Sequence, residues 1–134
     1  MHRHQAAAAS GADDRPLVKF PDQMCIHMLA NMRDHLLALQ EIPDALPRQQ
    51  YDTAGDIAEQ RPGMTSLKLH GADEAAGFMT DAMQAIGTAM YQAASRFALA
   101  AKDAAATGNV KPALEAMARV TQQCVACHAS YWVQ

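Results

Sequence analysis

Apolar residues recur every three to four positions along most of the chain, and this spacing predicts helices. Proline and glycine interrupt the spacing at three places, which separates four helical segments. Gly108 stands where the third helix should end, and Asn109 and Pro112 suit the beginning of the fourth. The connector between the second and third helices contains a further short turn near Leu67. The predicted helices cover residues 22–41, 48–61, 75–106 and 109–132.

Four helices with mostly short connections predict an all-α protein, an antiparallel four-helix bundle. Strand-forming aromatic residues are scarce, at 5% of the chain, which supports this fold class. A chain of 134 residues is long enough for one domain with its own core. We assign residues 21–134 to this domain, and we expect the alanine-rich residues 1–20 to form a disordered tail.

The first and fourth helices each have an apolar face. At about 100° per residue, the first helix gathers its apolar side chains within roughly 140°. Met28 lies near the middle of this arc, whereas His27 lies outside it. The arc comprises Met24, Cys25, Met28, Leu29, Met32, His35, Leu36 and Leu39. The corresponding stripe of the fourth helix comprises Leu114, Met117, Thr121, Cys124, His128 and Tyr131.

Charge excludes several classes of partner. The formal net charge is -3, and acidic and basic residues are interspersed along the chain, so we expect no nucleic-acid surface. No apolar run is long enough to cross a membrane. The cysteine count is three, an odd number, which makes a simple disulfide framework unsuitable.

Two of these cysteines belong to a motif near the C-terminus. Cys124, Cys127 and His128 form Cys-x-x-Cys-His, the attachment signature of c-type haem. Each thiol can add across one vinyl group of the porphyrin, and one helical turn between the sulfurs provides the required span. The histidine that follows can bind the iron as its proximal ligand.

Three different roles for these cysteines fit the pattern less well. A thioredoxin-like pair would need a strand before it and a helix after it, whereas this motif ends a helix. A zinc site that added Cys25 and His27 is disfavoured, because residues two apart on a helix diverge by about 160°. A purely structural cysteine pair would not need the histidine.

The motif "CVACH" in the last turns of the last helix, followed by Tyr131, resembles the class II c-type cytochromes. These are cytochrome c′ and its low-spin relatives. The resemblance implies a haem near the end of the C-terminal helix. It also implies a distal methionine ahead of an Asn-x-Arg pattern, which here places Met28 before Asn31 and Arg33. One difference is Trp132, which stands where the family often has arginine.

Met28 opposite His128 would give a six-coordinate, low-spin iron centre. Met24, Met32 and His35 are alternative distal ligands, and an open distal position is another. Methionines at helical spacing are also common core residues, so the haem motif is what favours a ligand role for Met28.

These features predict a periplasmic electron-transfer cytochrome with one covalent haem c and redox proteins as partners, rather than an enzyme. A distal face of methionine and leucine offers no acid–base groups for catalysis. No export signal is visible in residues 1–16, so we expect it to have been removed. The alternative functions are five-coordinate binding of NO or CO and, in a different class, copper handling by methionine and histidine side chains.

Ile26, Ala30 and Leu37 form a second apolar strip on the outside of the first helix, which predicts a homodimer through that helix. This mode of dimerisation also occurs in the family that the chain resembles.

The remaining histidines and the third cysteine have simpler expected roles. We expect His35 at the edge of the core or near a haem propionate, His70 exposed in the connector, and Cys25 as a small buried hydrophobic residue. His2 and His4 belong to the expected tail.

Overall fold

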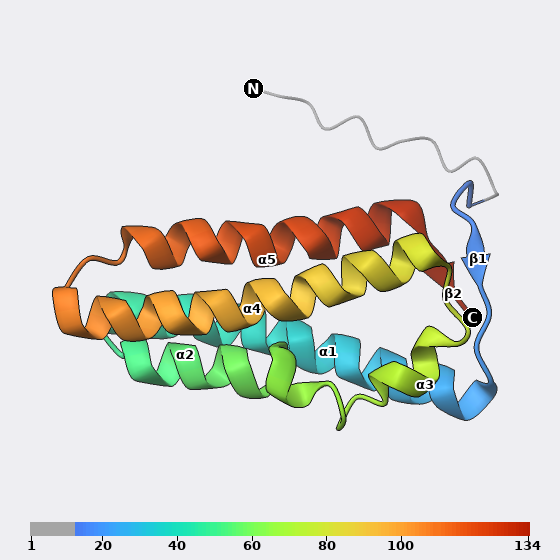
Figure 1. Ribbon diagram of the computed structural model, residues 1–134, viewed down its shortest axis with the longest axis horizontal. Coiled ribbons are helices and arrows are strands. Elements are labelled where there is room, and N and C mark those ends of the chain that lie inside the picture. The colour runs from blue at the N-terminus through green and yellow to red at the C-terminus, as the bar shows by residue number, and fades with distance from the viewer. Residues whose placement is uncertain (1–12) are drawn as a thin grey trace.

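Five α-helices make up most of the computed structural model, which describes residues 13–134 (Figure 1). They pack against one another as a helical bundle, which confirms the all-α part of the prediction. The four longer helices are α1 (Asp22–Ala45), α2 (Tyr51–Gln60), α4 (Asp81–Thr107) and α5 (Lys111–Ser130). The shorter elements are 3-10 helices η1 (Leu46–Arg48) and η2 (Met64–Ser66), helix α3 (Ala72–Ala76), and strands β1 (Leu17–Val18) and β2 (Trp132–Val133).

Several helix boundaries differ from the prediction. Helix α5 ends at Ser130 instead of reaching Trp132, which lies in β2, and α2 begins at Tyr51. Helix α1 continues through Pro43 to Ala45, because Ile42 and Ala45 are buried and their packing holds the extra turn. The predicted third helix is divided into α3 and α4. Thr80 begins α4, since its hydroxyl accepts a hydrogen bond from the backbone N–H of Met83 at 3.1 Å.

The boundary between α4 and α5 follows the predicted signals. Gly108 adopts the left-handed conformation with φ of 73°, and its N–H bonds to the carbonyl of Ala104. The side chain of Asn109 accepts a hydrogen bond from the N–H of Lys111 at 3.2 Å, and Pro112 lies in the first turn of α5.

The main core is built from small side chains. Helix α4 packs between α2 and α5, and α1 packs on α2 (Figure 1). Phe97 of α4 is the largest fully buried side chain. Alanines surround it, so the helix backbones can approach closely. The buried cluster comprises Ala38, Ile42, Ala45, Leu46, Ala54, Ala58, Ala93, Ala94, Phe97, Ala98, Ala101, Ala113 and Val120.

A second apolar cluster lies where α5 ends, and part of it comes from the N-terminal segment. Strand β1 pairs with β2 in parallel, with Leu17 opposite Trp132 and Val18 opposite Val133. Val18 and Phe20 are buried in the cluster, beside Ala75 and Met83. The prediction of a disordered tail is therefore wrong for the last residues of that segment. Local sequence could not reveal a strand whose partner lies more than a hundred residues away. The first 12 residues, with His2 and His4, lie outside the described part of the chain.

Among residues 13–134, no helix combines the length and the apolar character needed to cross a bilayer.

Candidate functional site

The predicted haem-attachment residues lie in the last two turns of α5. Cys124 and Cys127 are half-buried, and His128 is exposed. Residues three and four apart are neighbours on a helix surface, so the two cysteines lie along one side of α5. The helix ends at Tyr131, whose N–H still bonds to the carbonyl of Cys127 at 3.0 Å.

Both thiols of the motif are in an environment that keeps them protonated. Burial raises the pKa of the Cys124 thiol, and it also raises the pKa of the Cys127 thiol. The nearby Cys124 raises the pKa of Cys127 further. Neither cysteine is in a disulfide, and neither is Cys25.

The structure brings the start of α1 to the end of α5. Met24, Cys25 and Met28 of α1 pack against the second apolar cluster, and Cys127 and Tyr131 of α5 pack against the same cluster. Met28 is half-buried, which agrees with its predicted position on the inner face of the helix. Cys25 is half-buried rather than fully buried.

The buried face of α1 is rotated from the predicted arc. His35, Ala38, Ile42 and Ala45 are buried, and the last three contribute to the core that α2 shares. The opposite edge of the arc is uncovered, since Leu29 is 43% exposed and Leu36 is 69% exposed. The prediction that these two leucines face the core is wrong. Small side chains let α1 approach α2 closely, and this packing turns the larger leucines outward.

A second exposed strip on α1 agrees with the prediction. Ile26 and Leu37 are exposed, as is Ala30. The homodimer expected through this helix stays a prediction.

On α5, the predicted apolar stripe is correct only in part. Leu114 is exposed, whereas Ala113 and Val120 are the buried residues of this helix. Met117 and Thr121 are half-buried. The buried face is centred on the alanine and valine because α5 packs closely along α4.

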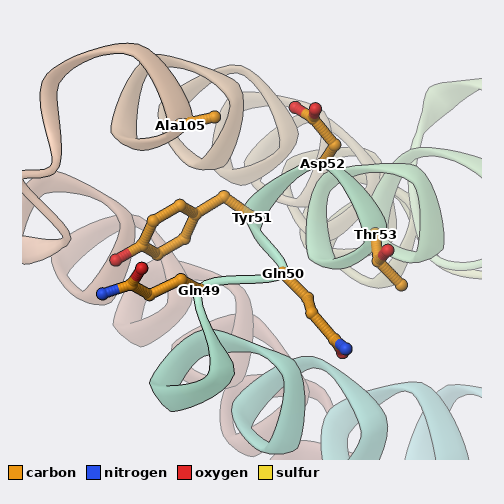
Figure 2. Close-up of a pocket in the computed structure, with 6 residues that line it drawn as sticks. All are labelled: Gln49, Gln50, Tyr51, Asp52, Thr53 and Ala105. Carbon is orange, nitrogen blue, oxygen red and sulfur yellow. The ribbon is translucent and has the colours of Figure 1, made fainter.

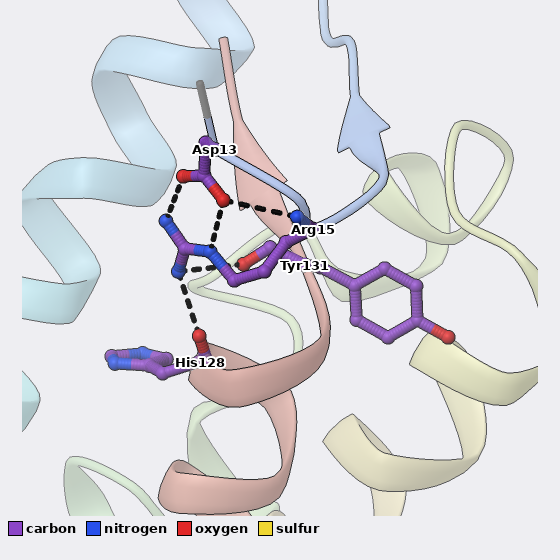
Figure 3. A network of polar contacts seen from close by, with 4 residues as sticks. All are labelled: Asp13, Arg15, His128 and Tyr131. Carbon is purple, nitrogen blue, oxygen red and sulfur yellow. Dashed lines mark hydrogen bonds and ion pairs between the residues drawn. The ribbon is translucent and has the colours of Figure 1, made fainter. Parts of the chain in front are cut away.

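Sequence reasoning missed a residue that contacts the motif directly. Nη1 of Arg15 donates a hydrogen bond to the carbonyl oxygen of His128 at 2.7 Å and another to that of Tyr131 at 3.1 Å (Figure 3). The guanidinium also pairs with the carboxylate of Asp13, and this pairing lowers the pKa of Asp13 to about 2. No sequence signal could have found this contact, because it joins positions 113 residues apart.

A buried polar cluster lies farther along α1. His35 and His70 are 7% and 8% exposed, and their ring centroids are 5.0 Å apart. Nδ1 of His70 is 2.8 Å from the hydroxyl of Tyr91, whose pKa burial raises to about 12. The prediction that His70 is exposed is wrong, because the connector folds back onto α1 and α4. The expectation that His35 lies at the core edge is compatible with its position.

An ion-pair network flanks the histidines. The guanidinium of Arg61 donates to the carboxylate of Asp34, with a shortest distance of 2.7 Å, and it also pairs with Glu41. This hydrogen bonding lowers the pKa of Asp34. The network ties the end of α2 to the middle of α1.

Two surface pockets lie away from these sites. Figure 2 shows one at the turn between α1 and α2, lined by Gln49–Thr53 and Ala105. Figure 1 places that turn at the opposite end of the bundle from the C-terminus of α5. A second pocket lies between α4 and α5, beside Arg96 and Arg119. Neither includes a predicted haem ligand.

Within residues 13–134, no three side chains of histidine, cysteine, aspartate or glutamate are placed to share a metal ion.

Comparisons of the chain with protein-family models, with curated proteins and with solved structures gave no match.

Proposed function

We propose that this chain is an electron-transfer cytochrome that binds one haem c through Cys124 and Cys127, with His128 as the proximal iron ligand. The observation that supports the proposal is the complete attachment motif at the end of α5, beside an apolar cluster that includes Met28. In this proposal α1, α2, α4 and α5 form the antiparallel four-helix bundle of a class II c-type cytochrome. The haem would lie at the end of the bundle where α5 terminates.

The residues present fit such a group. Two protonated thiols and an imidazole are the donor set that covalent haem attachment uses, and they lie within five residues of one helix. Haem is largely apolar. Its faces would suit the methionines of the second cluster and the uncovered edge of α1, where Leu29 and Leu36 are exposed to water in this structure.

When bound, haem supplies an iron that exchanges one electron reversibly. Each cysteine would contribute a sulfur and a proton, which add across one vinyl double bond. A carbon–sulfur bond would form and the proton would go to the other vinyl carbon, so the addition would need no oxidant. His128 would donate its imidazole nitrogen to the iron, and Met28 would donate its thioether from α1, a soft ligand that stabilises the ferrous state.

Electron transfer is the function that requires the least of the chain. It needs one ligated iron close to the surface, whereas catalysis would need acid–base groups above an open position. Cys124 and Cys127 are only half-buried and His128 is exposed, so an iron bound there would lie close to the surface. In the proposal the protein works in a bacterial periplasm, where such motifs receive haem after export, and its partners are other redox proteins.

The test is expression with a haem-maturation system, followed by mass spectrometry and acid–acetone extraction. We expect a mass increase of one haem, with the colour left on the polypeptide. A Cys124→Ser, Cys127→Ser double variant should lose all covalent haem. Cys25→Ser is the matched control, because it removes the cysteine outside the motif and should keep the haem.

Absorption spectra of the same samples distinguish electron transfer from gas binding. A low-spin oxidised protein that resists CO in its reduced form supports Met28 ligation and electron transfer. A high-spin protein that binds CO quickly would replace the electron-carrier proposal with gas binding. A chain that leaves the maturation system without covalent haem would refute both.

A further inference from the structure

The end of α5 has a backbone group that its own helix does not satisfy. In a continuing helix, the N–H of Trp132 would bond to the carbonyl of His128. Instead that N–H donates to the carbonyl of Pro16 at 3.2 Å, because β2 leaves the helix and pairs with β1. The His128 carbonyl, on the residue that would bind iron, therefore needs another donor.

Arg15 provides that donor. One nitrogen of its guanidinium reaches the carbonyl oxygens of His128 at 2.7 Å and Tyr131 at 3.1 Å. Helix C-termini attract cationic side chains because their free carbonyls have a partial negative charge. Arg15 thus caps the turn of α5 that contains the motif (Figure 3).

The guanidinium is itself held in place. Its Nε donates to Oδ1 of Asp13 at 2.8 Å, its Nη2 pairs with the other carboxylate oxygen, and the N–H of Arg15 donates to Oδ1 at 3.1 Å. A two-pronged arginine–carboxylate pair has a defined geometry. The arginine that caps α5 is therefore oriented by a residue two positions before it.

We infer that Arg15 is a positioning residue for the proximal histidine, which it holds by fixing the backbone of the last turn of α5. This inference rests on the proposed function, because it assigns His128 to iron. Helix ends fray, and His128 lies only two residues before the end of α5. In Figure 3 its imidazole points away from the Tyr131 ring, and it projects from the same turn of backbone whose carbonyls Arg15 binds.

The same pair of residues controls the local charge. With Asp13 present, the positive charge of Arg15 is balanced. Removing the arginine would leave a carboxylate near the motif and favour ferric iron, whereas removing the carboxylate would leave a cation and favour ferrous iron. Both side chains are partly exposed, so this electrostatic effect should weaken as salt is added. The effect on imidazole orientation should not.

The experiment compares holoprotein from wild type, Arg15→Gln and Lys19→Gln. Lys19 is exposed in the same segment and loses the same charge, which makes it the matched control. Mass spectrometry first establishes covalent haem in all three, and its absence from wild type would refute the proposed function alone. The readouts are the reduction potential at low and high salt and the line widths of the ferric electron paramagnetic resonance spectrum.

We expect Arg15→Gln to broaden the spectrum and to lower the potential, with part of that shift remaining at high salt. Lys19→Gln should match wild type in both. If Arg15→Gln lowers thermal stability but leaves line widths and high-salt potential unchanged, Arg15 is only a helix cap and the inference is wrong.

If Arg15→Gln does not fold, Asp13→Asn serves instead. It keeps the arginine, so it should raise the potential at low salt and broaden the spectrum less. An unchanged spectrum and potential in Asp13→Asn would overturn the inference.

Discussion

His35 should make the folded protein less stable as the pH falls below neutrality. The side chain is 7% exposed, and its buried Nε2 has no hydrogen-bond partner among residues 13–134. Burial, assisted by the neighbouring His70, lowers the pKa of His35 to about 4 from the ordinary value of 6.5. The folded protein therefore holds His35 neutral at a pH where the unfolded chain binds a proton.

The size of the effect follows from this difference in pKa. The unfolded state gains the proton first, so stability is lost as the pH falls from about 6.5 and the loss ends below about 4. One full step in pKa corresponds to about 1.4 kcal/mol, which makes the complete loss about 3 kcal/mol. By pH 5, about 2 kcal/mol should already be gone. The pKa of His70 is also lowered, mainly by burial, so the stability lost through His70 on acidification adds to the stability lost through His35.

Urea denaturation at several pH values between 7 and 5 measures this loss. Within that range the Asp34 carboxyl contributes little, because its pKa is lowered from 3.8 and its contribution is lost only at lower pH. Wild type is compared with His35→Gln, which keeps a polar side chain but cannot titrate. His27→Gln, at an exposed position of the same helix, controls for the removal of one histidine.

As the pH is lowered, the free energy of unfolding of wild type should decrease more steeply than that of His35→Gln. Between pH 7 and pH 5, wild type should lose about 2 kcal/mol more unfolding free energy than His35→Gln. Contributions that both chains share, including any from bound haem, cancel in this difference. Parallel pH profiles for the two chains would show that His35 is not held neutral by its surroundings.

Three further predictions concern the ligand, the core and the backbone. If Met28 binds iron, Met28→Ala should convert a low-spin ferric spectrum to high spin and speed CO binding; an unchanged spectrum would exclude Met28 as the ligand. Phe97→Ala should lower the free energy of unfolding in urea by about 3–5 kcal/mol, because Phe97 is fully buried, whereas Leu99→Ala on the exposed side of α4 should stay within about 0.5 kcal/mol of wild type. Comparable losses in these two variants would contradict the assigned core. Gly108→Ala should destabilise the protein by about 1 kcal/mol, because Gly108 has a φ of 73°. Gly87→Ala should stabilise it by about 0.5–1 kcal/mol, because Gly87 lies inside α4 with open space around it. Shifts of the melting temperature with the same sign in both variants would be evidence against this backbone assignment.

The predictable parts of the fold are those with local causes. Gly108 and Pro112 mark the boundary between α4 and α5, because each acts through its own backbone conformation. The break before α4 also has a local signal. Thr80 followed by Asp81 is an N-terminal capping pattern, but the apolar spacing continues across it from α3, and the continuous spacing favours one long predicted helix.

The parts that could not be predicted depend on contacts between distant residues. Arg15 is an ordinary charged residue in sequence, and only the pairing of β1 with β2 brings it to the end of α5. His70 follows an irregular connector, so no periodic pattern indicates that it is buried against His35 and Tyr91. Both belong to polar groups whose partners lie on other elements, and hydrophobic periodicity contains no information about such partners.

The misplaced face of α1 has a different cause, and it bears on the proposed function. The apolar arc of α1 is wider than the face that α2 and the core cover. Leu29 and Leu36 lie on the uncovered part of the arc and are exposed. Apolar surface of this kind favours burial, by about 25 cal/mol for each Å² removed from water. A haem attached to Cys124 and Cys127 would be a large apolar group at the same end of the bundle as Met28. Disagreement between the apolar pattern of a sequence and the observed burial tends to occur at functional sites. In a chain whose core is completed by a cofactor, we expect such uncovered apolar residues on the helix that supplies the distal ligand.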